Sequence, residues 1–371
     1  YNQYDYIIIL TLWNQLYIYT ILEREEFMKE FKLAVVGATG VVGRAALKIL
    51  EEKKLPISEY VFFASKKSAG TKISFLGKEY VVKELNEHSF DEGFDFAIFS
   101  AGGDTSKKYS PIAASHRCVV VDNSSAFRMD EQVPLIVPEV NPEEIKKNKG
   151  IIANPNCSTI QAVVALKPLD DKYKIKRIVY STYQAVSGAG RDGIYDLENG
   201  IKNFKESSDI NVASSNKYEL KKFPYPIFNN CLPHIDVFLD NGYTKEEMKM
   251  INETRKILGR PDLAITATTV RVPVLNSHSE SINVEFENDY SLEEVKDLLK
   301  NSPGIKVIDD VSSLKYPLAT DATGQDDVLV GRIRRDFSIP NGLNFWCVAD
   351  NIRKGAASNA IQIVEKLIEF N

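Results

Sequence analysis

A glycine-rich turn links an apolar run to an amphipathic segment early in the sequence. The apolar run at 33–36 is followed by glycines in the spacing Gly-x-x-Gly-x-x-Gly, at Gly37, Gly40 and Gly43. Apolar residues then recur at helical spacing, at Val42, Ala46, Ile49 and Leu50. A strand, a tight turn and a helix in this order bring backbone N–H groups to a pyrophosphate, so the turn predicts a dinucleotide site. The alternative is a tight turn that binds nothing.

Further β-rich runs follow the glycine turn without the alternation of apolar and polar residues that marks a half-exposed strand. They occupy 60–63, 94–99 and 118–121. Such runs, separated by helical segments, are typical of a parallel sheet that is covered on both faces. The sequence therefore predicts an α/β protein whose N-terminal domain is a Rossmann-type, doubly wound sheet.

The pattern changes after residue 156. The runs at 270–274 and 284–286 alternate better, which suits a sheet with one exposed face, and 354–370 has the spacing of a helix. We therefore expect a second, α+β domain with a mixed sheet, interleaved with the first. The expected division assigns 28–156 with 346–371 to the dinucleotide-binding domain and 157–345 to the catalytic domain.

Residues 1–27 do not fit this pattern, and the first methionine is Met28. The stretch from Tyr6 to Leu22 is apolar, but polar residues interrupt it, Asp5 stands where a signal peptide would carry positive charge, and no small-residue cleavage site follows. We interpret 1–27 as upstream sequence outside the working domain. A native extension or a membrane anchor is the alternative.

The composition narrows the class of protein. Lys and Arg total 46 against 51 Asp and Glu, and this net charge of −5 gives no electrostatic reason to bind nucleic acid or an anionic membrane. The four cysteines lie far apart, with no Cys-x-x-Cys pair and no zinc spacing, so we expect neither a disulfide scaffold nor a metal site. These features are typical of a globular cytoplasmic enzyme.

The end of the second expected strand indicates which dinucleotide binds. An NAD site would have Asp or Glu there, to bind the ribose 2′-hydroxyl. The residues after Ala64 are instead Ser65, Lys66, Lys67 and Ser68. Hydroxyl and ammonium groups without a carboxylate favour a 2′-phosphate, and therefore NADP. The alternative is a solvated, charged turn.

One of the four cysteines lies where a thiol can be activated. Cys157 follows Asn156 at a turn from an apolar run into a helix. Cys118 and Cys347 lie inside strand-like runs, and Cys231 has no helix start behind it. Because a helix N-terminus stabilises a thiolate, we expect a lowered thiol pKa at Cys157. The alternative is a buried capping cysteine.

Two of the four histidines are candidates for acid–base chemistry. His88 lies in a polar loop and His116 near the end of a helix. His234 lies in a loop, and His278 follows the expected strand at 270–275, where a strand-end loop could reach a cleft. Either could instead be a structural histidine, and the residues alone do not choose between them.

Several longer motifs, taken together and in order, resemble the bacterial branch of the aspartate-semialdehyde dehydrogenases. They lie at 37–43, 65–70, 154–159, 181–190, 246–249, 271–273 with 278–280, and 350–357. The resemblance runs from about Met28 to the C-terminus. One departure is Lys67, where the family often has Arg, and this departure leaves the strength of the NADP preference open because Lys lacks the planar fork.

The resemblance implies a role for each residue at a matching position. Cys157 would be the acyl-accepting nucleophile, His278 the general acid/base, and Gln184 the residue that orients the substrate. The implied substrate residues are Arg271 and Glu246 for the carboxylate and amino groups, and Arg128, Asn156 and Lys249 for the phosphate. The implied cofactor residues are Gly37, Thr39, Gly40, Val41, Val42, Ser65, Lys67, Ser68, Ser187, Gly188 and Asn351. The family also implies a homodimer built on the second domain.

The reaction that this resemblance implies is the NADPH-dependent conversion of L-aspartyl 4-phosphate to L-aspartate 4-semialdehyde through a cysteine thioester. This step would serve lysine or diaminopimelate, methionine, threonine and isoleucine synthesis. A thiolate nucleophile, a histidine and cationic groups for two anions match that chemistry. The nearest alternative is another phosphorylating dehydrogenase such as N-acetyl-glutamyl-phosphate reductase, which would not need Glu246 for a free amino group. A non-catalytic scaffold is the alternative from another class.

Overall fold

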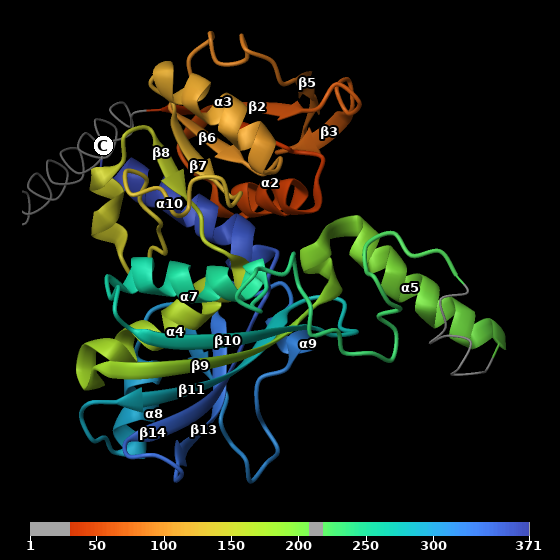
Figure 1. Cartoon of the computed structure of the whole chain (residues 1–371). Helices are drawn as coiled ribbons and strands as arrows, with labels where there is room; N and C mark the ends of the chain where they lie inside the picture. The colour runs from red at the N-terminus through yellow and green to blue at the C-terminus, as the bar shows by residue number, and fades with distance from the viewer. Residues whose placement is uncertain (1–29, 208–217, 371) are drawn as a thin grey trace, which may run out of the picture.

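The structure, a computed structural model, describes residues 30–207 and 218–370. The prediction for residues 1–27 lies outside the described residues. Two sheets, one above the other in Figure 1, form the centres of two domains that face each other. In the described part of the chain, no helix combines the length and the apolar character needed to cross a membrane.

The first sheet is parallel throughout, with strand order β5-β2-β1-β6-β7-β8. Its strands are β1 (Phe31–Val36), β2 (Ile57–Ala64), β5 (Lys83–Glu84), β6 (Phe96–Phe99), β7 (Val119–Asp122) and β8 (Ile151–Ala153). Its helices are α2 (Val41–Lys53), α3 (Gly103–Ser115) and α10 (Asn359–Glu369). Leu33 and Val35 of β1 pack with α2 and α10, whereas Ala34 and Val36 pack in the cluster that includes Ala113 of α3. Both faces are therefore covered, and the predicted doubly wound domain is confirmed.

The second sheet is mixed, with strand order β10-β9-β11-β14-β13-β12. Its strands are β9 (Ile175–Gln184), β10 (Ala264–Arg271), β11 (His278–Phe286), β12 (Ile305–Val307), β13 (Val328–Asp336) and β14 (Gly342–Ala349). The β9–β10 and β12–β13 pairs are parallel and the other pairs are antiparallel. Every second residue of β11 is buried, as the alternation predicted.

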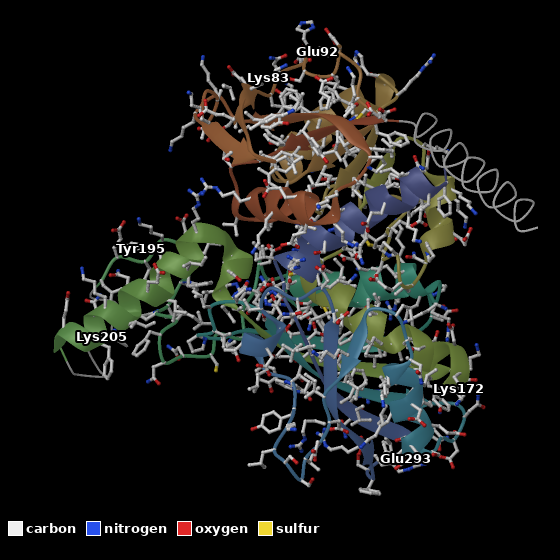
Figure 2. The ribbon with its side chains drawn as sticks, turned by 180° about the vertical axis from the view of Figure 1, so that it is seen from behind. Lys83, Glu92, Lys172, Tyr195, Lys205 and Glu293 are labelled. Atoms are coloured by element: carbon white, nitrogen blue, oxygen red, sulfur yellow. The ribbon has the colours of Figure 1, made fainter. Side chains whose placement is uncertain are left out.

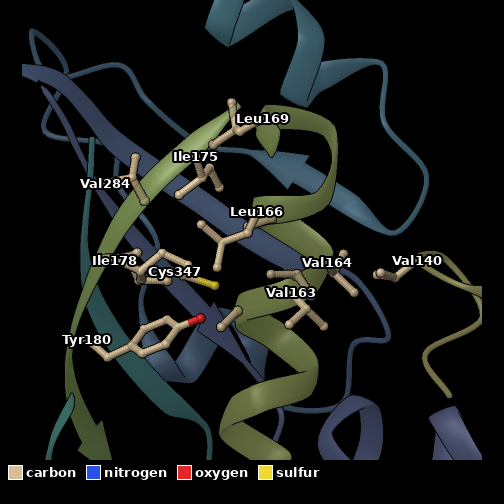
Figure 3. Packing of buried hydrophobic residues seen from close by; sticks show 14 of the residues in the cluster. Val140, Val163, Val164, Leu166, Leu169, Ile175, Ile178, Tyr180, Val284 and Cys347 are labelled. Atoms are coloured by element: carbon tan, nitrogen blue, oxygen red, sulfur yellow. The ribbon is translucent and has the colours of Figure 1, made fainter. Parts of the chain in front are cut away.

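Three helices contribute to the core of the second sheet: α4 (Cys157–Tyr173), α7 (Lys245–Leu258) and α8 (Leu292–Lys300). Figure 3 shows Leu166 of α4 directed toward Ile178 and Tyr180 of β9. Because α4 begins at Cys157 and is buried along most of its length, this core fixes the place of the candidate nucleophile.

The remaining elements join or flank these layers. They are the hairpin β3 (Lys72–Phe75) and β4 (Lys78–Val81), the 3-10 helices η1 (Pro142–Lys147) and η2 (Val186–Ala189), α5 (Gly190–Ser207), α9 (Ala319–Ala322) and the π-helix η3 (Arg353–Ser358). Figure 2 shows α5, marked by Tyr195 and Lys205, extending away from the body of the molecule.

Three local expectations are corrected. The strand expected at 270–274 ends at Arg271, and His278 is the first residue of β11 rather than part of a loop. The helix expected at 354–370 is divided into η3 and α10. The expected domain boundary before 346 falls inside β14, which pairs with β11 and β13 up to Ala349 and Val348 respectively. An apolar run carries no sign of where the chain leaves one sheet for another, so the sequence could not place this boundary.

Candidate active site

The first turns of α2 and α4 open onto one cavity where the two domains meet. The cavity has a volume of about 630 Å³. The predicted residues that line it are Gly40, Val41, Val42, Arg128, Asn156, Cys157, Ser187, Gly188 and Asn351. Residues predicted for the cofactor and for the chemistry are thus brought together, although the sequence separates them widely.

The glycine turn before α2 depends on glycine at two positions. Gly37 has a φ of +86° and donates its N–H to the carbonyl oxygen of Phe63 in β2 (2.8 Å). A Cβ at Gly43 would lie 2.2 Å from the carbonyl oxygen of Gly37. Gly40 caps α2 without a hydrogen bond from any described side chain, and the first turn of α2 has no acidic residue. This helix start therefore fits the pyrophosphate of a dinucleotide.

The turn after β2 lies beside the glycine turn because the carbonyl oxygen of Phe63 accepts a hydrogen bond from the N–H of Gly37. Ser65 and Lys67 are exposed and Ser68 is half-buried, and none of the three lines the cavity. A ligand that starts at the glycine turn would have to continue past the end of β2 to meet them.

Cys157 begins α4 and is held by its neighbours in sequence and space. The side chain of Asn156 caps the helix by accepting from the backbone N–H of Ser158 (3.0 Å) and Thr159 (3.3 Å). Gly355 of η3 packs against the other side, where a Cβ would lie only 2.7 Å from Cβ of Cys157. The glycine at 355 therefore leaves room for the candidate nucleophile.

The thiol of Cys157 is enclosed, although the residue keeps partial exposure to the cavity. Burial and Glu246 raise its pKa to about 12, while Arg271, Arg128 and the backbone N–H of Ser158 act in the opposite direction. The expectation of a lowered thiol pKa is therefore wrong for this arrangement. The helix N-terminus is present as predicted, but burial outweighs it.

His278 is fully buried at the start of β11, and its hydrogen bond identifies its protonated atom. Its Nδ1 accepts from the backbone N–H of Ala185 (3.0 Å). Burial, and secondarily Arg271, hold the pKa of His278 well below its ordinary value, so the ring is neutral. A neutral ring that accepts at Nδ1 carries its proton at Nε2. Nε2 has no partner among the described residues and faces Gly188 in the cavity wall.

Three of the predicted substrate residues bind a fourth, Glu246. Its carboxylate accepts from the side chains of Asn156 (2.8 Å), Gln184 (3.4 Å) and Lys249 (3.0 Å). Burial opposes its charge, but Lys249 and Asn156 outweigh burial and lower the pKa of Glu246. The buried Arg271 donates to the carbonyl oxygen of Ala185 (2.7 Å), and its Nη1 lies near Gly188.

A second cavity of about 390 Å³ adjoins the first, and Arg128 lines both. Lys249 also lines this second cavity. The two cations predicted for the phosphate therefore line the same second cavity, and Arg128 also lines the cavity that holds Cys157.

Asn351 and Ser187, both predicted to lie at the nicotinamide end, bind each other. The amide of Asn351 donates to the hydroxyl of Ser187 (3.1 Å) and its oxygen accepts from the backbone N–H of Ser277 (2.9 Å). These bonds connect the start of η2 to the turn before η3, at the rim of the cavity that holds Cys157.

Other candidates lie elsewhere. Cys347 is buried in β14, Cys118 is buried directly before β7, and Cys231 is exposed. The ring of His234 stacks on Phe238. Among the described residues, no three His, Cys, Asp or Glu side chains are grouped so that they could hold a metal.

Three residues near the site were missed by the sequence reasoning. Arg191 donates to the carbonyl oxygen of Thr39 (3.2 Å) and lines the cavity. Gly355 lies inside the motif at 350–357, so a signal was present. Glu253 follows Glu246 and Lys249 at i+7 and i+4, the spacing of one helix face, and this spacing could have identified it.

Comparisons with known proteins show to which family the chain belongs. Residues 32–148 match the model of the semialdehyde dehydrogenase NAD-binding domain, and residues 166–354 match the semialdehyde dehydrogenase dimerisation domain. The chain is 55% identical over 341 residues to the aspartate-semialdehyde dehydrogenase of Aquifex aeolicus, which covers 91% of this chain and 98% of that protein. The chain belongs to the aspartate-semialdehyde dehydrogenase family.

Relatives in this family are also similar in structure. The aspartate-semialdehyde dehydrogenase of Bacillus subtilis is 48% identical over 340 residues, which cover 91% of this chain and 98% of that protein. The crystal structure of aspartate semialdehyde dehydrogenase II from Vibrio cholerae, complexed with ASA, has a TM-score of 0.87 at 45% identity, covering 92% of this chain and 99% of that chain. The Candida albicans enzyme with NADP has a TM-score of 0.69 at 26% identity, covering 91% and 98%.

Membership of the aspartate-semialdehyde dehydrogenase family confirms the resemblance on which the sequence analysis rested. The protein is an oxidoreductase with an NAD(P)-binding domain and a dimerisation domain.

Proposed function

We propose that the protein converts L-aspartyl 4-phosphate to L-aspartate 4-semialdehyde with NADPH, through a thioester on Cys157, in the biosynthesis of lysine or diaminopimelate, methionine, threonine and isoleucine. The observation that supports this most directly is the single cavity onto which the first turns of α2 and α4 open. One helix start suits a dinucleotide pyrophosphate and the other carries the nucleophile. The comparisons with the family support the choice of substrate.

The first half of the reaction forms the thioester. The Cys157 thiol loses its proton to solvent in the cavity, the resulting thiolate attacks the acyl carbon of the substrate, the C–O bond to phosphate breaks, and inorganic phosphate leaves. Arg128, which lines both cavities, and Lys249, which lines the second, would hold the departing anion. Asn156 would contribute from its position at the start of α4.

The amino-acid end of the substrate needs groups of opposite charge. Arg271 would bind the α-carboxylate, and Glu246, whose lowered pKa keeps it charged, would bind the α-ammonium group. Gln184, bonded to Glu246, would orient the acyl group beside Cys157. A reductase for an N-acetylated substrate would have no use for a carboxylate in this place.

His278 would act on the oxygen of the tetrahedral adduct. Because Nδ1 already accepts a hydrogen bond, Nε2 is the atom that can exchange a proton, and it donates to the oxygen as negative charge develops there. His278 is expected to act as a general acid or base, and this geometry favours the general acid.

The cofactor would lie between the glycine turn and η2. Gly37, Thr39, Gly40, Val41 and Val42 would surround the pyrophosphate, Ser65, Lys67 and Ser68 the 2′-phosphate, and Ser187, Gly188 and Asn351 the nicotinamide end. When bound, NADPH supplies hydride for reduction of the acyl group. The absence of a carboxylate between Ser65 and Gly70 supports NADP over NAD.

The arrangement of the chain supports further parts of the proposal. We assign residues 28–156 and the segment after Ala349 to the dinucleotide-binding domain, and 157–349 to the catalytic and dimerisation domain, and the pairing of β14 in the second sheet supports this division. The match to a dimerisation domain supports a homodimer built on that domain. We place the enzyme in the cytoplasm on the family resemblance.

The test is phosphate-dependent reduction of NADP by the purified protein with L-aspartate 4-semialdehyde. Formation of NADPH that requires inorganic phosphate is the expected result. Turnover of N-acetyl-glutamate semialdehyde instead would move the function to the related reductase. No turnover of either aldehyde would contradict the proposal and favour a scaffold role.

Replacing Lys67 with alanine should weaken the preference for NADP. Loss of one charge-assisted hydrogen bond to the 2′-phosphate costs about 1.5–3 kcal/mol, so KM for NADP should rise about 10- to 100-fold while KM for NAD changes little. Lys66→Ala is the matched control, because it removes the same charge from the neighbouring exposed position. Equal effects of Lys67→Ala on both cofactors would contradict a role at the 2′-phosphate.

A further inference from the structure

Glu253 of α7 accepts two hydrogen bonds at the boundary between the nucleophile and the proposed phosphate site. Its side chain is 1% exposed. Oε1 accepts from Nη1 of Arg128 (3.1 Å), and Oε2 accepts from the backbone N–H of Asn156 (2.6 Å). One buried carboxylate therefore joins Arg128, which lines both cavities, to the residue that caps α4.

The guanidinium of Arg128 is held on three sides. Besides the bond to Glu253, its Nε donates to the carbonyl oxygen of Asn154 (2.9 Å) and its Nη2 to that of Asn123 (2.9 Å). The two carbonyl bonds come from the loops that follow β8 and β7, whereas Glu253 comes from the second domain's helix α7. Glu253 thus fixes Arg128 relative to the catalytic domain.

Asn156 is held just as closely. Its side chain caps the N–H groups of Ser158 and Thr159 and donates to Glu246 (2.8 Å), while its backbone N–H binds Glu253. Any shift of Asn156 would move the first turn of α4, and Cys157 is the first residue of that turn.

We infer that Glu253 is a positioning residue that fixes the phosphate-binding Arg128 and the nucleophile Cys157 at one distance from each other. The inference rests on the proposed function for the role of Arg128. Phosphate leaves from the carbon that becomes bound to Cys157, and in the reverse reaction phosphate attacks that carbon. The carboxylate of Glu253 therefore serves both directions of the reaction. When Arg128 and Cys157 are held at a fixed distance, the bound phosphate lies in line with the thioester carbon.

A carboxylate is needed because both partners are donors. Glutamine has one oxygen and one NH₂ group, so Glu253→Gln places a donor against either Arg128 or the N–H of Asn156. Either orientation leaves a buried donor without its acceptor and lets one of the two partners shift. Since a misplacement of about 1 Å can cost about 100-fold in rate, the kinetic effect should be large.

The matched control is Asp170→Asn, at the opposite end of α4. Asp170 is also buried and also binds one arginine, Arg260 (2.8 Å), and one backbone N–H, that of Ile175 (2.9 Å), but both donate to the same oxygen, Oδ1. Both variants remove a buried carboxylate from an arginine. The amide oxygen introduced by Asp170→Asn can still accept from both donors, so this variant tests the loss of a buried negative charge beside an arginine, and an effect of that loss alone should appear in both variants.

The experiment measures KM for phosphate, the rate of the NADPH burst in single-turnover oxidation of L-aspartate 4-semialdehyde, and the rise in Tm caused by inorganic phosphate. For Glu253→Gln we expect kcat/KM for phosphate to fall about 10- to 100-fold, together with a smaller phosphate-induced rise in Tm or a slower burst, depending on which partner loses its acceptor. Asp170→Asn should lower Tm without changing any of these three quantities.

A double variant tests whether Glu253 acts through Arg128. In the background of Arg128→Gln, adding Glu253→Gln should cause little further loss of phosphate affinity, because the group being positioned is gone. Wild-type kinetics for Glu253→Gln, or equal changes in Asp170→Asn, would overturn the inference. Absence of phosphate-dependent turnover in the wild-type protein would instead overturn the proposed function, while the phosphate-induced rise in Tm would still test the role of Glu253.

Discussion

Replacing Cys157 with alanine is expected to abolish phosphate-dependent reduction of NADP, by a factor on the order of 10⁴ or more. Without the sulfur, no thioester forms and phosphate has no acyl group to attack. The pKa of Cys157 is raised to about 12, so little of this thiol is charged at neutral pH in the free protein. We therefore expect iodoacetamide to modify Cys157 slowly in the free protein.

Cys231→Ala is the control for this substitution. Cys231 is the exposed free cysteine, and it does not line the cavity, so its removal should leave turnover unchanged. Unaltered cofactor binding in Cys157→Ala, measured by the quenching of protein fluorescence by NADPH, would show that the site still folds. Residual phosphate-dependent turnover in Cys157→Ala above about 1% of wild type would contradict the thioester mechanism.

Glu280→Gln is expected to stabilise the protein at alkaline pH. Glu280 lies on β11 two residues after His278; it is fully buried, and neither of its oxygens has a hydrogen-bond partner among the described residues. Burial raises the pKa of Glu280 well above its ordinary value. The folded protein therefore keeps a proton that the unfolded chain releases.

The sign of the pH dependence follows from this raised pKa. Stability from the protonated carboxyl is present below its ordinary pKa and falls by about 1.4 kcal/mol per pH unit as pH rises toward the raised value. Glutamine has the same shape and does not titrate, so the difference in denaturant midpoint between Glu280→Gln and wild type should grow from pH 5 to pH 8. The exposed Glu287→Gln should show no such growth. A constant difference across this range would show that Glu280 is charged in the folded state.

A neutral Glu280 is also compatible with a neutral ring at His278 in the candidate active site. A charged carboxylate on the same face of β11 would favour the protonated ring of His278. With Glu280 uncharged, burial and Arg271 keep His278 neutral, as the donating form requires. The buried acid is therefore compatible with the role proposed for His278.

The features that the sequence predicted correctly are local. The glycine turn, the helix start at Cys157 and the covered strands of the first sheet each follow from neighbouring residues, whose spacing determines backbone conformation and burial. The pKa of Cys157 could not be predicted in this way, because Glu246 and the enclosing residues come from distant parts of the chain. The sequence predicts a loop at His278 for a similar reason, since the strand that holds this residue is defined by pairing with β9 and β14.

The contacts of Glu253 also could not be predicted from neighbouring residues. Its helical spacing from Glu246 indicates a shared face, but only the fold brings that face against Arg128 and the backbone of Asn156. The chemistry of a dual acceptor depends on two donors that no sequence pattern places together.

The helix α10 has a consequence for the order in which this protein is made. It packs in the apolar cluster that includes Leu33 and Val35 of β1, yet it follows the whole second sheet in the sequence. During synthesis on the ribosome, the face of the first sheet that α2 and α10 share therefore has only α2 against it while the catalytic domain is translated (Figure 1). The nucleotide-binding half can be completed only after the half that performs the chemistry, which makes the nascent first sheet the part of the chain most dependent on protection from aggregation.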